Sequence, residues 1–238
     1  MAQRVIDGQP RQRWQILFSR GRPALRMRQS ELVAEFERVF REAQLPLSYT
    51  RALKPRARLK LAANLPVGIE LQGEVLEAYF DELVPIERLQ AAAEEFPEGV
   101  ELRAAKEVWH GFPSAASQVR SAEYEVAVRG DETLTSDALR GAVVRLLATR
   151  ALEGKRRRGE TERRSDVGNR DLRPLIEDVE VLDVDETSHS GRLRAVLRLD
   201  ATGAGRPEDV VAALDLPLRV AEVVRTRLLF VDTPPIAR

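Results

Sequence analysis

The sequence contains clusters of arginine and lysine whose spacing would allow them to bind a polyanion such as nucleic acid. Guanidinium groups bind phosphate oxygens in a bidentate manner and stack on nucleic-acid bases. The stretch LEGKRRRGETERRSDVGNRDLRP (152–174) holds eight Lys/Arg and five Asp/Glu. The grouping of its cations predicts RNA contacts by Lys155, Arg156, Arg157, Arg158, Arg163 and Arg164. The stretch ends in the turn-like sequence DLRP, which predicts an architectural role for Asp171 and Arg173. A solvated loop is the other interpretation, because three glycines interrupt the stretch.

Two further basic clusters lie near the N-terminus. They add Arg20, Arg22, Arg26, Arg28, Arg51, Lys54, Arg56, Arg58 and Lys60 to the predicted RNA-binding residues. Residues 1–60 hold 14 basic and 5 acidic groups, whereas residues 61–118 hold 3 and 11. The formal charge of the whole chain is nevertheless zero, with 38 groups of each sign. This balance argues against a protein that coats nucleic acid, which would be strongly basic throughout.

Catalytic and metal-binding signals are weak. The chain has no cysteine, and its two histidines, His110 and His189, have no second ligand at metal-binding spacing. We therefore expect no metal and no cofactor. No nucleophile elbow, P-loop or GxGxxG motif is present. Carboxylates such as Glu70 and Glu74 could form an acid/base pair, although alternation on an exposed strand explains them equally well.

Hydrophobic periodicity predicts the elements that position these residues. In the first half, Trp14, Ile16 and Phe18 alternate as in a half-buried strand, and an apolar helical spacing follows over residues 32–43. Strand patterns at 54–64, 69–80 and 100–109 and a helix starting at Pro85 complete the order β-α-β-β-α-β. This order is that of the ferredoxin-like fold.

The same order recurs after residue 118. A strand, a helix capped by Thr135 or Ser136, a hairpin across DETSHSG, a short helix from Pro207 and a final strand follow in turn. The fold class is therefore α+β, with two ferredoxin-like lobes in tandem. The predicted boundaries are a flexible segment 1–11, a first lobe 12–109, a linker 110–118, a second lobe 119–232 and a tail 233–238.

The stretch LPLSYTRALKPRARLKLAANLPVGIELQGE resembles the central signature of the radical-SAM-linked bacterial domain of unknown function. The matching positions are Leu45, Pro46, Leu47, Tyr49, Pro55, Leu65, Pro66, Val67, Gly68 and Glu74, and segments starting at Asp171, Arg206 and Val223 also fit. The chain departs from the pattern at Gln29 and Lys54, where the family tends to carry His and Asn. The resemblance thus implies that polar groups able to form a site in the family are replaced in this chain, and Gln29 cannot act as an acid or base.

The resemblance implies a partner. Such domains are fused to, or encoded beside, B12-binding-type radical SAM proteins, often near ribonuclease G and ribosomal protein genes. A radical SAM cluster needs three cysteine thiolates, and this chain has none, so the resemblance implies a radical SAM protein encoded separately. It also implies ribosomal or transfer RNA as the cargo.

Three hypotheses about function follow. The first is a non-catalytic protein that binds RNA and presents it to a radical SAM enzyme. The second is an RNA-processing or RNA-modifying enzyme that uses carboxylates such as Glu74 or Asp171, and the third is a protein–protein adaptor without nucleic acid. No secretory signal or membrane-spanning run is visible in the sequence, which predicts a cytoplasmic protein with no membrane partner.

Overall fold

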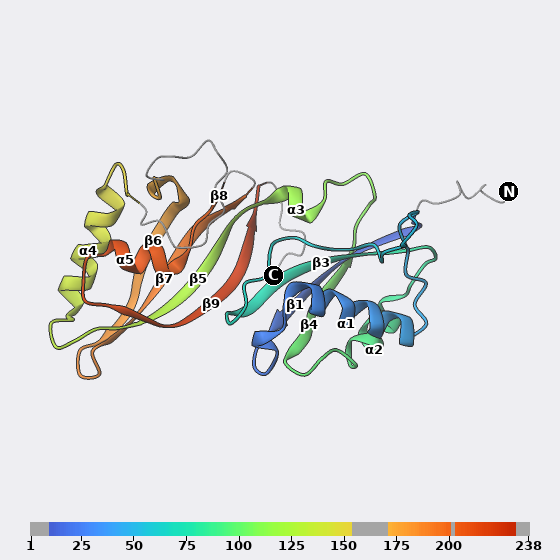
Figure 1. The fold of residues 1–238 in the computed structure, drawn as a ribbon, viewed down its shortest axis with the longest axis horizontal. Coiled ribbons are helices and arrows are strands. Elements are labelled where there is room, and N and C mark those ends of the chain that lie inside the picture. Colours follow the sequence, from blue (N-terminus) through green and yellow to red (C-terminus); the bar gives the residue numbers. More distant parts are fainter. Residues whose placement is uncertain (1–9, 154–170, 201–202, 232–238) are drawn as a thin grey trace. The chain divides into compact units, whose positions relative to one another are not determined.

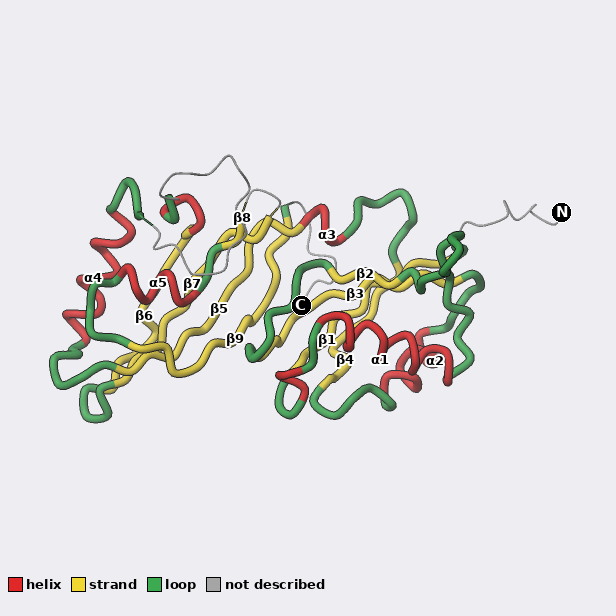
Figure 2. Tube along the Cα trace, in the orientation of Figure 1, coloured by secondary structure: helices red, strands yellow, loops and turns green. Residues whose placement is uncertain are grey.

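The computed structural model describes residues 10–153, 171–200 and 203–231. The chain forms two compact units, Met1–Val119 with Arg227–Arg238, and Arg120–Thr226. Both units combine helices and strands (Figure 2), and the strands pair mostly antiparallel, which confirms the fold class at the level of α+β. The predicted terminal segments 1–11 and 233–238 lie largely outside the described residues.

The first unit has two long helices and four strands. Its strands are β1 (Gln12–Arg20), β2 (Leu59–Leu61), β3 (Glu70–Phe80) and β4 (Val100–Glu107), and its long helices are α1 (Gln29–Glu42) and α2 (Ile86–Ala93). The short elements are the 3-10 turn η1 (Ala24–Arg26) and helix α3 (Ala115–Gln118). β1, β3 and β4 run alongside one another (Figure 1), with β1 between the other two. β2 pairs with β3, and all three pairings are antiparallel.

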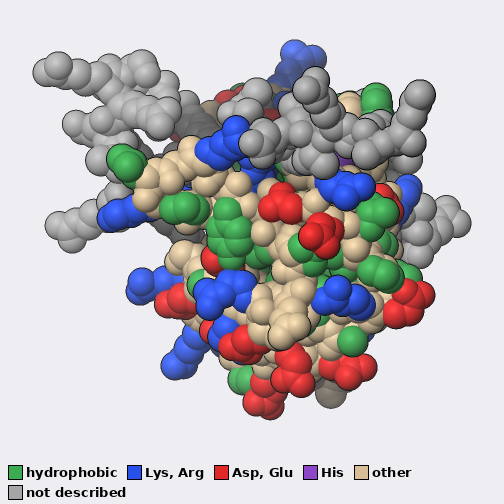
Figure 3. All heavy atoms as spheres, turned by 90° about the vertical axis from the view of Figure 1, so that its right-hand side faces the viewer, with side chains coloured by type: hydrophobic (Ala, Val, Ile, Leu, Met, Phe, Trp, Pro, Cys, Tyr) green, Lys and Arg blue, Asp and Glu red, His purple; other side chains and the backbone are tan. Residues whose placement is uncertain are grey.

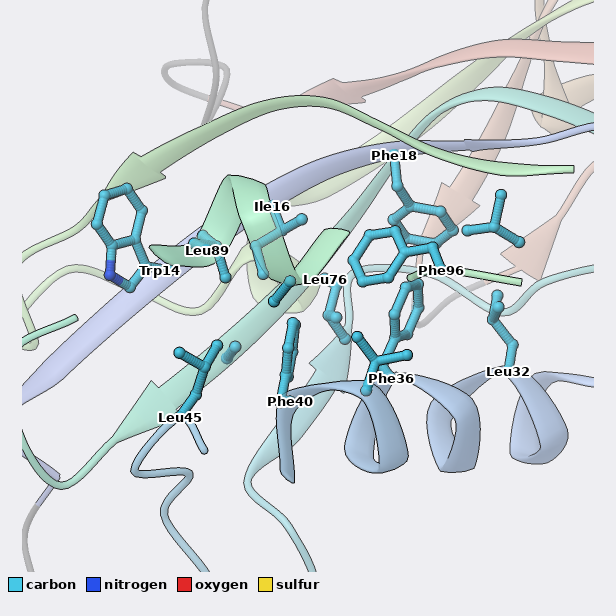
Figure 4. Close-up of a cluster of buried hydrophobic side chains, with 14 of the residues drawn as sticks. Trp14, Ile16, Phe18, Leu32, Phe36, Phe40, Leu45, Leu76, Leu89 and Phe96 are labelled. Atoms are coloured by element: carbon cyan, nitrogen blue, oxygen red, sulfur yellow. The ribbon is translucent and has the colours of Figure 1, made fainter. Parts of the chain in front are cut away.

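The core of this unit follows from two periodicities. Trp14, Ile16 and Phe18 alternate along β1 and therefore point to one face, as a period of two requires. Phe36 and its neighbours on α1 recur at helical spacing and cover that face (Figure 4). The rings of Phe18 and Phe36 meet edge to face with centroids 5.2 Å apart, a preferred aromatic geometry. α1 and α2 thus occupy the same side of the strands.

The second unit repeats this order of elements. It contains β5 (Val119–Arg129), α4 (Ser136–Ala148), η2 (Arg173–Leu175), β6 (Ile176–Asp185), β7 (Ser190–Asp200), β8 (Gly203–Ala204), α5 (Pro207–Ala213) and β9 (Arg219–Phe230). Neighbouring strands follow the order β9-β5-β7-β6, with β8 beside β7. The side chain of Thr135 caps α4 by accepting a hydrogen bond from Ala138, and the predicted hairpin is β6 with β7. From Arg227 onward, β9 belongs to the first unit.

Two segments differ from the predicted elements. The expected strand at 54–64 is reduced to the three residues of β2, because residues 48–58 form hydrogen bonds among themselves instead of joining the sheet over their full length. The expected linker 110–118 contains α3, whose first turn is capped by the Ser114 side chain. Gly68 has the positive φ of 82° that its turn before β3 predicts.

Candidate nucleic-acid interface

The face of the first unit opposite α1 and α2 is polar. Alternation places Arg13 and Gln15 of β1 there, and the strand register sets Tyr79 beside Arg13 and Glu77 beside Gln15. Lys60 of β2 pairs with Glu77 in turn, so its side chain leaves the sheet on the same side. We call these five residues, Arg13, Gln15, Lys60, Glu77 and Tyr79, the polar face.

A buried ion pair forms the centre of the polar face. Arg13 donates a hydrogen bond to Glu77 Oε1, and the two side chains are only 2% and 1% exposed. The same oxygen accepts hydrogen bonds from Gln15 Nε2 at 3.1 Å and from the backbone N–H of Ala115 at 2.8 Å. A carboxylate held by three donors is a structural anchor and is poorly placed to exchange a proton with a substrate.

Tyr79 brings an aromatic ring to this face. Its hydroxyl lies 3.5 Å from Glu77 Oε2, and the Arg13 guanidinium and the Lys60 ammonium lie 5.8 Å and 5.9 Å from its ring centre. Burial, together with the Glu77 carboxylate, raises the pKa of the Tyr79 hydroxyl. The ring therefore carries a neutral phenol at physiological pH and attracts cations to its π face.

Residues 48–60 continue the polar face as a basic ribbon. Backbone hydrogen bonds from Thr50 to Arg56 and from Arg58 to Ser48 fold it back on itself, and Tyr79 accepts the N–H of Ser48. The side chains of Arg51, Lys54, Arg56 and Lys60 are exposed, and Arg58 is half-buried. Residues 43–69 contain these five cations and no carboxylate. The ribbon is therefore a local concentration of positive charge.

Arg20 has a different role from the one the sequence predicts. Its side chain is fully buried, and its guanidinium donates hydrogen bonds to the backbone carbonyls of Met27, Pro66 and Ile69. Three accepting carbonyls hold the charge inside the protein and tie the loop before α1 to the loop before β3. Arg20 therefore does not reach a surface phosphate in this structure.

The two N-terminal basic clusters do not meet. Arg22, Arg26 and Arg28 are exposed in the loop that follows the end of β1, whereas the basic ribbon joins β3 near Tyr79, which pairs with Arg13 at the start of β1. At about 3.3 Å per residue, the length of β1 separates the clusters by roughly 25 Å. Only the basic ribbon is continuous with the polar face.

Of the basic stretch 152–174, the structure describes only residues 152–153 and 171–174. Lys155, Arg156, Arg157, Arg158, Arg163 and Arg164 lie outside the described residues, so their predicted role stays a prediction. Asp171 accepts hydrogen bonds from the backbone N–H groups of Leu152 and Arg173, which lower the pKa of its carboxyl. Arg173 donates to the carbonyls of Leu147 and Thr149 at the end of α4. Both residues support the architecture, as predicted.

The second unit carries a contrasting, acidic face. Opposite the buried side chains of β7, Arg194 contacts Glu123, Asp178 and Glu180. Arg192 of the same strand contacts Asp183 at 2.5 Å and Glu125 at 3.8 Å. Five carboxylates thus surround two guanidiniums, and this face repels a polyanion.

The remaining sequence candidates do not assemble into a reactive centre. Glu74 is buried, Glu70 is half-buried, His110 lies beside Tyr79 and His189 lies in the turn between β6 and β7. Among the described residues, no group of three or more His, Asp or Glu could hold a metal ion, and no helix could span a membrane. On the side shown in Figure 3, basic and acidic side chains are interspersed. Sequence reasoning missed Arg13 and Glu77, whose only signal was two charges within alternating strands.

Comparison with known proteins identifies a family but no function. The model of a family described as "Uncharacterized protein conserved in bacteria (DUF2344)" matches residues 13–207. A search of curated proteins found no match. A chain of the crystal structure of a Cbf5-Nop10-Gar1 complex is 12% identical over 90% of this chain and 48% of that chain, with a TM-score of 0.49. This chain thus spans about half the length of that one.

A second similar structure is that of a putative glycine cleavage system transcriptional repressor. It is 11% identical over 90% of this chain and 98% of that chain, with a TM-score of 0.26. Both structural similarities are too distant to carry an argument about fold or function.

Proposed function

The chain belongs to this family of uncharacterized proteins conserved in bacteria, and from that premise we propose that it is a non-catalytic RNA-binding protein that presents RNA to a radical SAM enzyme. The observation that carries the RNA-binding part is the basic ribbon. Residues 43–69 hold five cations and no carboxylate, and one of these cations, Lys60, lies 5.9 Å from the ring centre of Tyr79. Phosphate groups and bases are the ligands that such a combination attracts.

The strand order supports this location for the RNA. Each unit has the element order and neighbouring-strand pattern of a ferredoxin-like lobe, and we propose that both are such lobes. RNA-binding domains built on this arrangement use the sheet face opposite the helices and stack bases on aromatic side chains there. In the first unit that face carries Tyr79 and Lys60, whereas the next aromatic residue of the same strand, Phe80, is fully buried in the core.

The charge distribution favours the first unit as the binding unit. Arg192 and Arg194 of the second unit are surrounded by carboxylates, so that face has an excess of negative charge. A catalytic role for Asp171 is also disfavoured, because two backbone N–H groups hold its carboxylate in a turn. Presentation to a radical SAM enzyme rests on the family resemblance and on the lack of cysteine in this chain.

Removing the charge of the basic ribbon tests the proposal. The variant replaces Arg51, Lys54, Arg56 and Lys60 with Ala, and binding to a labelled single-stranded RNA is measured by fluorescence anisotropy at several salt concentrations. We expect weaker binding and a flatter salt dependence. The slope of log K against log salt should fall by about 0.7 for each lost phosphate contact, so by roughly 3 if all four contact phosphate.

A matched control removes the same charge elsewhere. Arg129, Arg140, Arg145 and Arg150 are exposed in the second unit, and replacing these four with Ala lowers the net charge equally. This control should keep the wild-type slope. Equal losses of RNA affinity in both variants would show that only the total charge of the chain matters. A wild-type chain that binds no RNA would favour the protein–protein adaptor.

A further inference from the structure

A turn beside the polar face exposes three ring-bearing side chains. Residues 109–112, here called the aromatic turn, are closed by a hydrogen bond of 3.0 Å from Phe112 N–H to the carbonyl of Trp109. The Trp109 side chain is 75% exposed and that of Phe112 49%, and His110 between them is also exposed. Aromatic side chains that stay in solvent give up the free energy that burial would provide. A cluster of them within four residues is therefore typical of a binding site.

Hydrogen bonds from the polar face fix the backbone at the end of the aromatic turn. The buried guanidinium of Arg13 donates to the carbonyl of Phe112 at 2.7 Å and to that of Pro113 at 2.9 Å. Glu77 fixes the next segment by accepting the N–H of Ala115. The buried ion pair therefore fastens the turn to the sheet, which lowers the entropy cost of ordering its rings on a ligand.

Glycine at position 111 is part of the same arrangement. The indole of Trp109 lies so close to Gly111 that a Cβ at this position would collide with the ring. Any other residue at 111 would have to displace the indole. The indole therefore packs over the backbone at Gly111 while its outer surface stays in solvent.

The aromatic turn is continuous with Tyr79 and the basic ribbon. The rings of His110 and Tyr79 lie 6.2 Å apart between centroids with a tilt of 35°, and the Lys60 ammonium lies 5.9 Å from the Tyr79 centroid. Rings for bases and cations for phosphates therefore adjoin one another. This combination matches the chemistry of an unpaired polynucleotide, whose bases are free to stack outside a duplex.

We propose that the aromatic turn and Tyr79 form a stacking platform for the unpaired bases of single-stranded RNA. The inference deepens the RNA-binding function proposed above and rests on it. Trp109 and Phe112 stack on bases, and Lys60 with the basic ribbon binds the connecting phosphates. A duplex does not fit, because its bases already stack on one another.

Trp109 can report its own contact with RNA. The chain has two tryptophans, and Trp14 is buried, with no hydrogen-bond partner for its Nε1 among the described residues. Trp14→Phe therefore loses no hydrogen bond and leaves Trp109 as the sole fluorescent indole. Titration of this variant with a single-stranded oligouridylate should quench Trp109, and a blunt RNA duplex of equal length should not.

Affinity measurements separate stacking from charge. Trp109→Ala and Phe112→Ala should each weaken single-strand binding about 5- to 100-fold without changing the salt slope, because stacking releases no counterions. Trp109→Phe keeps a ring and should retain most of the affinity. Circular dichroism of each variant checks that the fold is unchanged.

The outcomes distinguish the platform from RNA binding itself. If the chain binds RNA with a slope that depends on the basic ribbon, but Trp109→Ala and Phe112→Ala bind normally, the platform is wrong and the proposed function stands. Equal affinity for the duplex would also overturn the platform. No binding by the wild-type chain would overturn both, and a dimer that dissociates in Trp109→Ala would assign the turn to self-association instead.

Discussion

Replacing Glu77 with Ala should lower the free energy of unfolding by about 3–5 kcal/mol, the loss typical when one partner of a buried ion pair is removed. Arg13 would keep its charge in a site where its side chain is 2% exposed, with no carboxylate facing it. Gln15 and the N–H of Ala115 would lose their acceptor at the same time. Urea denaturation followed by circular dichroism measures the effect.

Two controls make this result specific to burial. Glu42 of α1 forms an exposed ion pair with Arg38, and Glu42→Ala should change the free energy of unfolding by less than about 1 kcal/mol. The double variant Arg13→Met with Glu77→Leu removes both charges and should recover much of the stability, because neither charge is then left buried alone. A Glu77→Ala chain as stable as the wild type would contradict the central role of the pair.

Arg20→Ala should also be strongly destabilising, by roughly 2–4 kcal/mol. The substitution removes a charged donor from three partly buried backbone carbonyls and opens a cavity where the side chain lay. Arg22→Ala, two residues along and exposed, should leave the free energy of unfolding within about 0.5 kcal/mol of the wild type. Thermal and urea unfolding of the two variants make the comparison.

The Arg20→Ala substitution should lower stability without lowering the affinity for RNA. At a temperature where Arg20→Ala remains folded, its affinity for single-stranded RNA should equal that of the wild type, since the Arg20 side chain is fully buried. If Arg20→Ala is folded but binds RNA more weakly, Arg20 contacts RNA as the sequence predicts, and the structural role assigned to it here is wrong.

The order of elements could be predicted because it depends on local patterns. Alternation of Trp14, Ile16 and Phe18 predicts β1, and helical spacing predicts α1. The same alternation leads from Phe18 to Arg20, so burial of Arg20 could have been inferred by extending the period of two. Its partners could not, because Pro66 and Ile69 lie in a loop more than forty residues along the chain.

The candidate site was less predictable because its parts come from distant segments. Arg13 and Glu77 are 64 residues apart, and each looks like an exposed polar residue of a half-buried strand. They become buried because residues 112–115 cross the polar face, and the sequence shows these residues only as a small, polar linker. The two basic clusters likewise look adjacent in the sequence, although β1 holds them at opposite ends of the sheet.

The most direct test is to map where RNA touches the chain. Ultraviolet crosslinking of the full chain to a uridine-rich single-stranded RNA, followed by mass spectrometry, identifies the peptides that carry nucleotide adducts. We predict adducts in the basic ribbon, at Tyr79 and in the aromatic turn, all in the first unit. Adducts confined to residues 120–226, or no crosslink at all, would contradict it.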